Sequence, residues 1–297
     1  MDGIINLLKP PHMTSHDAVG YLRRLLKTKK VGHTGTLDPM AAGVLPICIG
    51  NATKVSQFLL NDAKAYRCEL TLGCNTDTQD RWGTVTKVGK REVSQEEIIR
   101  VFNTFKGEIL QYPPMYSALK HRGKKLYELA RAGKTIEREA RKVTIYELNI
   151  LDIRGHKVLF DVCCSKGTYV RTLCEDIGNK LNTGGHMSFL LRTASGRFKL
   201  GETVTLEDLQ ETAVEDIERN YLFPIDYPLY NLPNVYIRSS SIKYLLNGND
   251  MLQKNILRHD PLKENEYVKI YAEEKFMAIG IVKTENQFYI DIQRVFN

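Results

Sequence analysis

Residues 31–46 concentrate the residue types that can do chemistry. The segment contains three glycines, two prolines, one histidine (His33) and one aspartate (Asp38). Because Gly and Pro disfavour helix interiors and central strands, this composition predicts a structured loop. The glycine spacing matches neither a P-loop nor a dinucleotide-binding loop, and one His with one Asp supplies too few ligands for a metal site. From composition alone, Asp38 is either a turn-forming residue before Pro39 or a catalytic carboxylate.

The overall composition indicates a soluble globular protein with material for roughly two domains. Of the 297 residues, 42% are hydrophobic and 26% are charged, and the net charge is +7. No run of 18 apolar residues occurs, so we expect no transmembrane span, and the N-terminus lacks the pattern of a signal peptide. The six cysteines form no C-x-x-C pair and no zinc-ligand spacing, which is typical of reduced thiols. We therefore expect a cytoplasmic protein without a membrane partner.

The positive charge is unevenly distributed along the chain. Lys120–Lys142 holds nine Lys or Arg and three Glu, a net charge of +6, whereas Gly201–Tyr230 holds eight acids and one Arg, a net charge of −7. A charge run is commonly a solvated helix face. A concentrated basic run with aromatic residues nearby, here Tyr116 and Tyr127, instead favours contact with a nucleic-acid backbone.

Hydrophobic periodicity predicts helices and strands that alternate along the chain. Helices are expected after the cap residues Thr14 or Ser15 and Ser94, and over Val170–Leu181. Alternation predicts strands over Tyr66–Leu72, Val143–Ile150 and Val158–Cys164. Because neighbouring strands follow one another with helices interspersed, we expect an α+β fold with a mixed, mainly antiparallel sheet and flanking helices.

A domain boundary is expected near Tyr230, where the acidic stretch and a proline-containing run end. We expect residues 1–230 to form one domain and residues 231–297, with a net charge of +1, to form a small β-rich module. The elements predicted in this module are a helix over Ser239–Leu246 and strands over Tyr267–Tyr271, Met277–Val282 and Phe288–Ile292.

The same residues carry a close resemblance to a known family. The loop Gly32–Pro39 resembles the G-H-T-G-x-L-D-P motif of the TruB-type tRNA pseudouridine-55 synthases, in which the Asp is the nucleophile. Six further blocks resemble the family's other motifs in the right order: Leu8–Pro10 with Thr14–Ser15, Lys64–Arg67, Thr76–Gly83, Pro113–Ala118, Lys166–Arg171 and His186–Arg192. The resemblance covers nearly the whole chain. It departs at His12, where the family usually has Gly, and this bears on the local turn geometry.

The resemblance implies a fold and a reaction. The fold is that of the pseudouridine synthases, with a thumb-like basic insertion at about residues 120–142 and a C-terminal PUA-like RNA-binding domain. The reaction is the isomerisation of uridine 55 in the T-loop of tRNA, after the base is flipped out of the stack. The T-arm of tRNA is the implied partner. A monomer without a guide RNA is expected, and no cofactor or metal is required.

The resemblance also implies roles for the catalytic candidates. Asp38 is the nucleophile, and Arg171 aims it through a forked, charge-assisted pair. An exposed surface arginine is the alternative, because Arg171 lies off the apolar stripe of its helix. Tyr66 stacks on the uracil and helps to remove the C5 proton, and a core tyrosine is the alternative.

Substrate contacts are implied for a second group of residues. His33 fills the space left by the flipped base, and the alternative is a histidine that stabilises its own loop. The other implied contacts are Tyr169, Leu190 and, with weaker support, Asp80 around the uracil pocket, and Lys124 and Lys125 on the T-arm phosphates.

Two other function classes are considered. A non-catalytic tRNA-binding or tRNA-folding protein is disfavoured as the sole role by the intact set of Asp38, Tyr66 and Arg171. A small-molecule α/β enzyme lacks support because no cofactor fingerprint is present.

Overall fold

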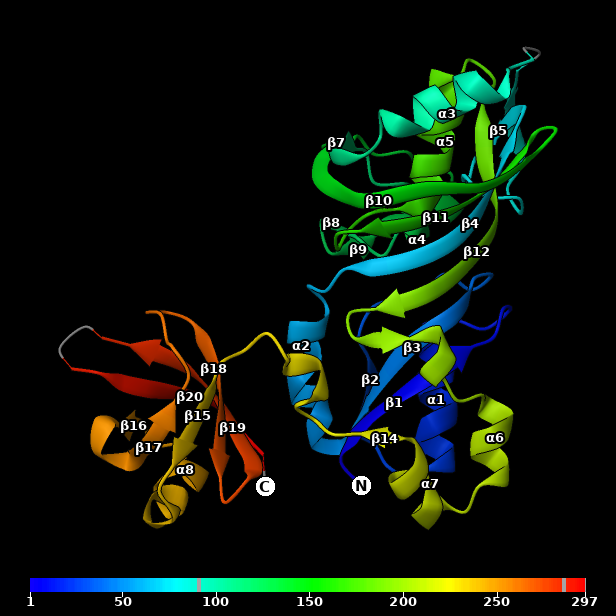
Figure 1. The fold of residues 1–297 in the computed structure, drawn as a ribbon. Coiled ribbons are helices and arrows are strands. Elements are labelled where there is room, and N and C mark those ends of the chain that lie inside the picture. Colours follow the sequence, from blue (N-terminus) through cyan, green and yellow to red (C-terminus); the bar gives the residue numbers. More distant parts are fainter. Residues whose placement is uncertain (90–91, 285–286, 297) are drawn as a thin grey trace.

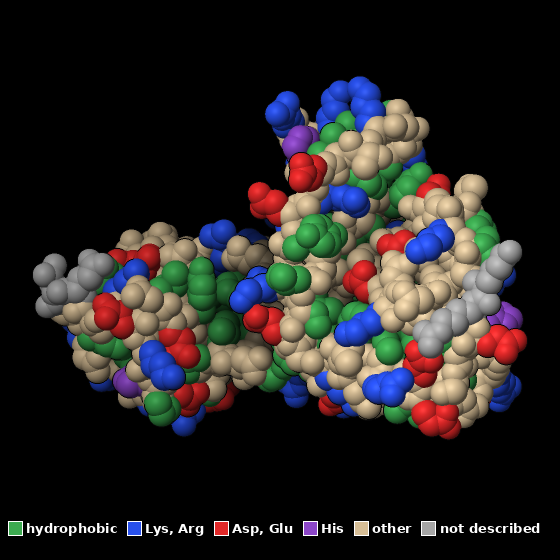
Figure 2. All heavy atoms as spheres, turned by 90° about the horizontal axis from the view of Figure 1, so that it is seen from above, with side chains coloured by type: hydrophobic (Ala, Val, Ile, Leu, Met, Phe, Trp, Pro, Cys, Tyr) green, Lys and Arg blue, Asp and Glu red, His purple; other side chains and the backbone are tan. Residues whose placement is uncertain are grey.

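The computed structural model describes residues 1–89, 92–284 and 287–296. The chain forms a larger part built on a ten-stranded sheet and a smaller C-terminal part built on a six-stranded sheet (Figure 1). The two chain termini lie near each other where the parts meet (Figure 1). Seen from above, Lys and Arg side chains gather at the end of a projection from the larger part (Figure 2).

The ten-stranded sheet is mixed and mainly antiparallel. Among the described residues, every strand pair in it is antiparallel except β3 and β12, which run parallel. This sheet confirms the expected α+β fold class. Its strands, in sheet order, are β14 (Leu222–Phe223), β1 (Gly3–Lys9), β3 (Ala42–Ile49), β12 (Gly185–Ser195), β4 (Lys64–Leu72), β11 (Lys157–Cys164), β10 (Arg141–Arg154) and β7 (Gly107–Gln111), with β13 (Phe198–Lys199) beside β12 and β2 (Val31–His33) beside β3.

Strand register brings the chemically interesting segments together. In β4, Tyr66 lies opposite Arg192 of β12, and Cys68 lies opposite Leu190. Strand β12 also pairs with the start of β3, where Leu191 lies opposite Ala42. Since the loop that carries Asp38 leads directly into β3, the sheet places this loop beside β4 and β12.

Helices begin where the cap residues predict. Thr14 caps α1 (Ser15–Leu25) in a capping box, in which its side chain accepts from the Asp17 N–H and the Asp17 carboxylate accepts from the Thr14 N–H. Ser94 caps α3 (Gln95–Asn103) by accepting from the Glu97 N–H. The other helices of the larger part are α2 (Ser56–Leu59), α4 (Leu126–Arg131), α5 (Val170–Lys180), α6 (Leu206–Glu211) and α7 (Val214–Tyr221).

Two apolar clusters fix the helices on different halves of the sheet. Residues of α3 and α5 pack with β4, β10, β11 and β12 in one cluster, and residues of α1, α6 and α7 pack with β1 and β3 in the other. Figure 1 shows the same division. The loop around Asp38 connects the halves, because Leu37 and Ala41 belong to the first cluster while the strands on either side, β2 and β3, contribute to the second.

The C-terminal part is β-rich, as expected, and has its own apolar core. The three predicted strands and the predicted helix are confirmed, but three further strands of two to four residues are too short to show an alternation pattern. Ile279 and Phe296 pack with Ile4 and Val44, so this part is joined to the larger one by apolar contact. Its elements are β15 (Asn234–Ile237), α8 (Ile242–Leu246), β16 (Met251–Leu252), β17 (Ile256–His259), β18 (Tyr267–Ala272), β19 (Lys275–Lys283) and β20 (Tyr289–Val295).

His12 occupies a backbone conformation that favours glycine. Its φ is 63°, in the left-handed region, and it lies in the exposed turn between β1 and α1. The family resemblance predicts Gly at this position. Because the turn keeps a glycine-like geometry, the backbone of His12 is strained.

We predict that His12→Gly raises the free energy of unfolding by about 0.5–1 kcal/mol, because glycine relieves the left-handed strain by more than it costs in chain entropy. Urea denaturation measures the change. Asn182→Gly is the matched control, since Asn182 has a φ of 57° but asparagine tolerates this region better. An equal or larger gain at Asn182 would contradict the explanation.

Candidate active site

Asp38 and Arg171 form a forked ion pair at the centre of the candidate site. Arg171 Nε lies 2.8 Å from Asp38 Oδ2, and Arg171 Nη2 lies 3.4 Å from Asp38 Oδ1. The Arg171 side chain is 7% exposed and the Asp38 side chain is 36% exposed. The alternative of an exposed surface arginine is therefore wrong. The pair leaves the carboxylate open to a ligand while its partner is buried.

Arg171 is held in place by other segments of the chain. Its guanidinium donates to the carbonyls of Thr78 (3.1 Å) and Tyr116 (3.0 Å). Asp80 Oδ2 lies 3.9 Å from Arg171 Nη1, and Asp80 Oδ1 accepts from the Thr78 hydroxyl at 2.6 Å. The turn that contains Thr78 and Asp80 covers the start of α5. Arg171 is therefore buried although it lies off the apolar stripe of this helix. The structure thus brings Asp80 to the site beside Arg171.

Two buried polar side chains fix the backbone of the loop around Asp38. The Ser15 hydroxyl donates to the Leu37 carbonyl at 3.1 Å and accepts from the Leu37 N–H at 2.9 Å. Burial, together with the charge of Arg192, lowers the pKa of Lys9 to about 8. The Lys9 Nζ donates to three backbone carbonyls, those of Pro10 (2.7 Å), Met13 (2.7 Å) and Pro39 (3.3 Å).

A second buried arginine, Arg192 of β12, holds the other half of the loop. It is the largest of the fully buried side chains. Its guanidinium donates to the carbonyls of Val44 (2.6 Å), Gly35 (3.3 Å) and Thr36 (3.4 Å). Gly43 permits the close approach of the two strands, because its φ is +118° and a Cβ there would lie 2.2 Å from the Arg192 carbonyl oxygen.

Sequence reasoning left Lys9 and Arg192 without a role, although both lie in the recognised blocks. The only available signal was a cation between apolar residues in a strand pattern, as in Leu7-Leu8-Lys9 and Leu190-Leu191-Arg192. Such a cation is more often exposed than buried. Burial depends on the irregular loop, whose unpaired carbonyls supply acceptors.

Tyr66 and Leu190 form part of the apolar wall beside Asp38. Leu190 is buried in the cluster that also contains Leu37 and Ala41, and Tyr66 packs against this cluster. Burial raises the pKa of Tyr66, while the Arg192 guanidinium, which bonds to its hydroxyl, opposes that shift. The phenol is therefore neutral at pH 7 and able to donate or accept a hydrogen bond. The interpretations of Tyr66 as a core residue and as a site residue are compatible.

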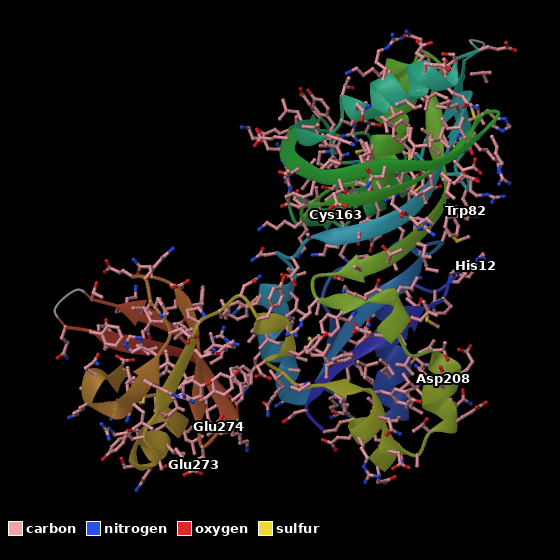
Figure 3. All side chains as sticks on the ribbon, viewed as in Figure 1. His12, Trp82, Cys163, Asp208, Glu273 and Glu274 are labelled. Atoms are coloured by element: carbon pink, nitrogen blue, oxygen red, sulfur yellow. The ribbon has the colours of Figure 1, made fainter. Side chains whose placement is uncertain are left out.

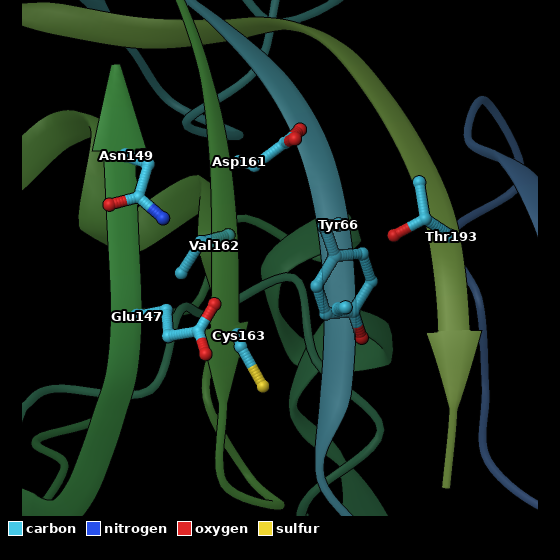
Figure 4. A pocket seen from close by; sticks show the side chains of 8 residues that line it. Tyr66, Glu147, Asn149, Asp161, Val162, Cys163 and Thr193 are labelled. Carbon is cyan, nitrogen blue, oxygen red and sulfur yellow. The ribbon is translucent and has the colours of Figure 1, made fainter. Parts of the chain in front are cut away.

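A shallow polar hollow lies on the opposite face of the same sheet. The side chains of Asn149, Asp161, Cys163 and Thr193 project into it, whereas the Tyr66 ring lies behind β4 (Figure 4). The Asp38–Arg171 pair is not among the residues that line this hollow. The hollow is thus separate from the candidate site, and the tyrosine ring faces away from it.

His33 ends β2, ahead of the loop that carries Asp38, and Tyr169 immediately precedes α5, the helix that carries Arg171. The His33 Nδ1 accepts from the Gly35 N–H at 3.3 Å, and burial together with the charge of Arg192 lowers the pKa of His33. The ring is therefore neutral at pH 7 with its proton on Nε2, and it supports its own loop. Tyr169 precedes α5, and both of its backbone polar groups bond to the Gln111 side chain. Burial raises the pKa of Tyr169.

Comparison with known proteins decides the family. Residues 23–170 match the N-terminal domain of TruB family pseudouridylate synthases, and residues 171–230 match the C-terminal domain of tRNA pseudouridylate synthase B. The tRNA pseudouridine synthase B of Alkaliphilus oremlandii is 53% identical over 99% of this chain and 98% of the relative. The chain belongs to the TruB family. The relative of the same name from Clostridioides difficile is 48% identical over 96% of each chain.

Solved structures agree with this TruB family assignment. The protein matched in a structure titled as a Cbf5-Nop10-Gar1 complex is 32% identical, with a TM-score of 0.78 over 99% of this chain and 85% of that one. A match in an archaeal box H/ACA sRNP Nop10-Cbf5 complex is 30% identical, with a TM-score of 0.77 over 99% of this chain and 86% of that one. The expected enzyme class, a pseudouridine synthase, is confirmed.

Lys124 and Lys125 lie on a hairpin of their own, apart from the Asp38–Arg171 pair. The hairpin consists of β8 (Lys120–His121) and β9 (Lys124–Lys125), joined at Arg122 and Gly123, which both have positive φ. We call Lys120–Lys125 the thumb hairpin. Lys124 is exposed, and the Lys125 Nζ lies 5.4 Å from the centroid of the Tyr127 ring. The thumb hairpin thus presents cations beside an aromatic ring.

The thumb hairpin is tied to the site through the backbone. The Tyr127 N–H donates to the Ser117 carbonyl at 3.1 Å, and the carbonyl of the preceding residue, Tyr116, accepts from Arg171.

No metal site is found in residues 1–89, 92–284 and 287–296, because no three His, Cys, Asp or Glu side chains there lie close enough together to hold an ion.

We predict that Arg192→Met lowers the free energy of unfolding by about 3 kcal/mol or more, because one buried and two partly buried carbonyls lose a donor. Arg67→Met is the matched control: Arg67 lies in β4 and pairs at the surface with Asp161 at 2.8 Å, so its loss costs about 1 kcal/mol or less. Urea denaturation of both variants measures the difference. Equal losses would mean that the carbonyl contacts of Arg192 do not stabilise the loop.

Proposed function

We propose that this chain isomerises uridine 55 in the T-loop of tRNAs to pseudouridine, with Asp38 as the nucleophile. The forked Asp38–Arg171 pair carries this proposal, because it aims a solvent-accessible carboxylate from a rigid, buried partner. The relatives named tRNA pseudouridine synthase B, at 44–53% identity over nearly the full chain, support tRNA as the substrate.

The reaction breaks the N1–C1′ bond of the uridine, turns the base and joins C5 to C1′. The C5 proton leaves and N1 gains a proton, so the change is an isomerisation without net gain or loss of atoms. A carboxylate attacks or assists at the sugar or the base, and Asp38 has the accessibility for either. Because the target base is stacked in a folded loop, it is first flipped into the pocket.

Other site residues then receive the roles that their positions support. Tyr66 stacks on the uracil, and its neutral hydroxyl takes part in moving the C5 proton. Neutral His33 occupies the space left by the flipped base. The residues that complete the pocket are Tyr169, Leu190 and, through Arg171, Asp80.

The basic thumb, residues 120–142, binds the RNA backbone through Lys124 and Lys125.

We take residues 1–230 as the catalytic domain and residues 231–297 as a PUA-like RNA-binding domain. We take the chain to act as a cytoplasmic monomer without a guide RNA. None of the described helices is long and apolar enough to cross a membrane.

Asp38→Asn is expected to abolish turnover while tRNA affinity stays within about tenfold, because phosphate contacts supply most of the binding free energy. Tritium release from tRNA labelled at C5 of uridine measures turnover, and filter binding measures affinity. Asp161→Asn is the matched control: it also pairs with an arginine at 2.8 Å, and its side chain is 38% exposed, but it lies on the opposite sheet face.

Appreciable turnover by Asp38→Asn, or an equal loss in Asp161→Asn, would remove the nucleophile role from Asp38. A wild-type protein that binds tRNA without releasing tritium would instead indicate a non-catalytic tRNA-binding protein. Failure to bind RNA at low salt would point to a small-molecule substrate.

Neutralising Lys124 and Lys125 together is expected to weaken binding of a T-arm stem–loop and to lower the slope of log K against log salt by up to about two units. Fluorescence anisotropy with labelled RNA at several salt concentrations gives the slope. The exposed lysines Lys263 and Lys275 of the C-terminal part serve as a matched pair. If both double variants show the wild-type slope, the thumb hairpin does not meet phosphates.

A further inference from the structure

The chain has one tryptophan, Trp82, and it lies at the surface. Its side chain is 48% exposed, although Trp is highly buried on average. The Arg81 guanidinium lies 5.7 Å from the centroid of the indole ring. Proteins that bind single-stranded nucleic acids present aromatic rings for base stacking beside cationic side chains.

Backbone contacts hold Trp82 in a defined position. The Trp82 N–H donates to Asp80 Oδ1 at 3.1 Å, and the Arg81 N–H donates to the Met187 carbonyl of β12 at 2.9 Å. Gly83 allows the turn to close tightly, since a Cβ there would lie 2.3 Å from the Thr78 hydroxyl oxygen. The exposed ring is therefore carried by a turn anchored to the central sheet.

The turn lies next to the reacting carboxylate. Asp80, which accepts from the Trp82 backbone, is 3.9 Å from Arg171, and Arg171 pairs with Asp38. Figure 3 shows Trp82 and His12 along the same edge of the larger part. The turn of His12 is itself joined to the loop of Asp38, because Lys9 bonds to the carbonyls of both Met13 and Pro39. Trp82 thus stands at the border of the catalytic loop.

We propose that Trp82, with Arg81 beside it, is a stacking platform for an unpaired base of the substrate RNA that neighbours the flipped uridine. This inference rests on the proposed function. Flipping a uridine removes a stacking partner from the adjacent bases and exposes their π faces. The indole ring supplies a stacking partner to an unpaired base outside the space that His33 occupies, and the Arg81 guanidinium favours a nucleotide over an apolar protein segment because it complements phosphate charge.

Intrinsic fluorescence tests the platform directly, because emission from the single tryptophan reports on Trp82 alone. The Asp38→Asn protein is titrated with a T-arm stem–loop RNA, and filter binding follows the same titration. Stacking predicts quenching of the emission that saturates together with filter binding. Emission that stays unchanged while filter binding saturates would overturn the platform and leave the proposed function intact.

Substitution measures the energetic effect in an otherwise wild-type chain. Trp82→Ala is expected to weaken stem–loop binding by about 5- to 100-fold, the range for losing one stacked base, whereas Trp82→Phe keeps most of the affinity. Tyr146→Ala is the matched control: Tyr146 is 56% exposed and lies on β10 of the larger part. Thermal unfolding of Trp82→Ala and Trp82→Phe separates a folding defect from a lost contact. Wild-type affinity in a folded Trp82→Ala would overturn the proposal.

Abasic substitutions identify the partner base. Each unpaired nucleotide of the stem–loop other than the target is replaced in turn. One abasic position should weaken binding to the wild-type chain as much as Trp82→Ala does, and should cause no further loss in Trp82→Ala. If, at every position, the loss of affinity caused by the abasic substitution simply adds to the loss caused by Trp82→Ala, then Trp82 contacts no base. Absence of tritium release by the wild-type chain is a separate result, which would refute the proposed reaction.

Discussion

Backbone carbonyls of the loop around Asp38 are the groups on which the site depends. A loop without regular secondary structure leaves its carbonyls without strand or helix partners, and a buried unpaired carbonyl costs free energy. Here Lys9 and Arg192 supply the missing donors from the buried side of the loop. The two cations are themselves solvated by carbonyl dipoles. Loop and cations therefore stabilise each other, and the position of Asp38 follows from both.

Arg171 connects this fixed loop with two other segments of the chain. It donates to Asp38 and to the carbonyls of Thr78 and Tyr116, which lie far apart in sequence. The Tyr116 segment continues through the Ser117 carbonyl into the base of the thumb hairpin. A continuous set of short contacts thus runs from the thumb hairpin to the carboxylate. Arginine suits this position because its planar fork serves several acceptors at once.

The sequence predicted the fold and the Asp38–Arg171 pair better than it predicted the residues that support them. Periodicity and cap residues located the main helices and strands, and the motif block identified Arg171 where periodicity alone suggested an exposed side chain. Lys9 and Arg192 received no role because their burial depends on carbonyls of a distant loop, and no local pattern reports such acceptors. The exposure of Trp82 depends equally on a turn whose geometry comes from contacts with β12.

The net charge of +7 is the sum of −7 over Gly201–Tyr230 and +14 over the rest of the chain, which includes +6 over Lys120–Lys142. The acidic stretch from Gly201 to Tyr230 contains α6 and α7, at the end of the larger part opposite α3, whereas β8 and β9 of the thumb hairpin belong to the half of the larger part that carries α3 (Figure 1). A polyanion is attracted to one region and repelled from the other, and both effects fall off within about 10 Å at moderate salt. The acidic helices and the thumb hairpin therefore act on an approaching polyanion with opposite sign. Total charge alone carries no such information.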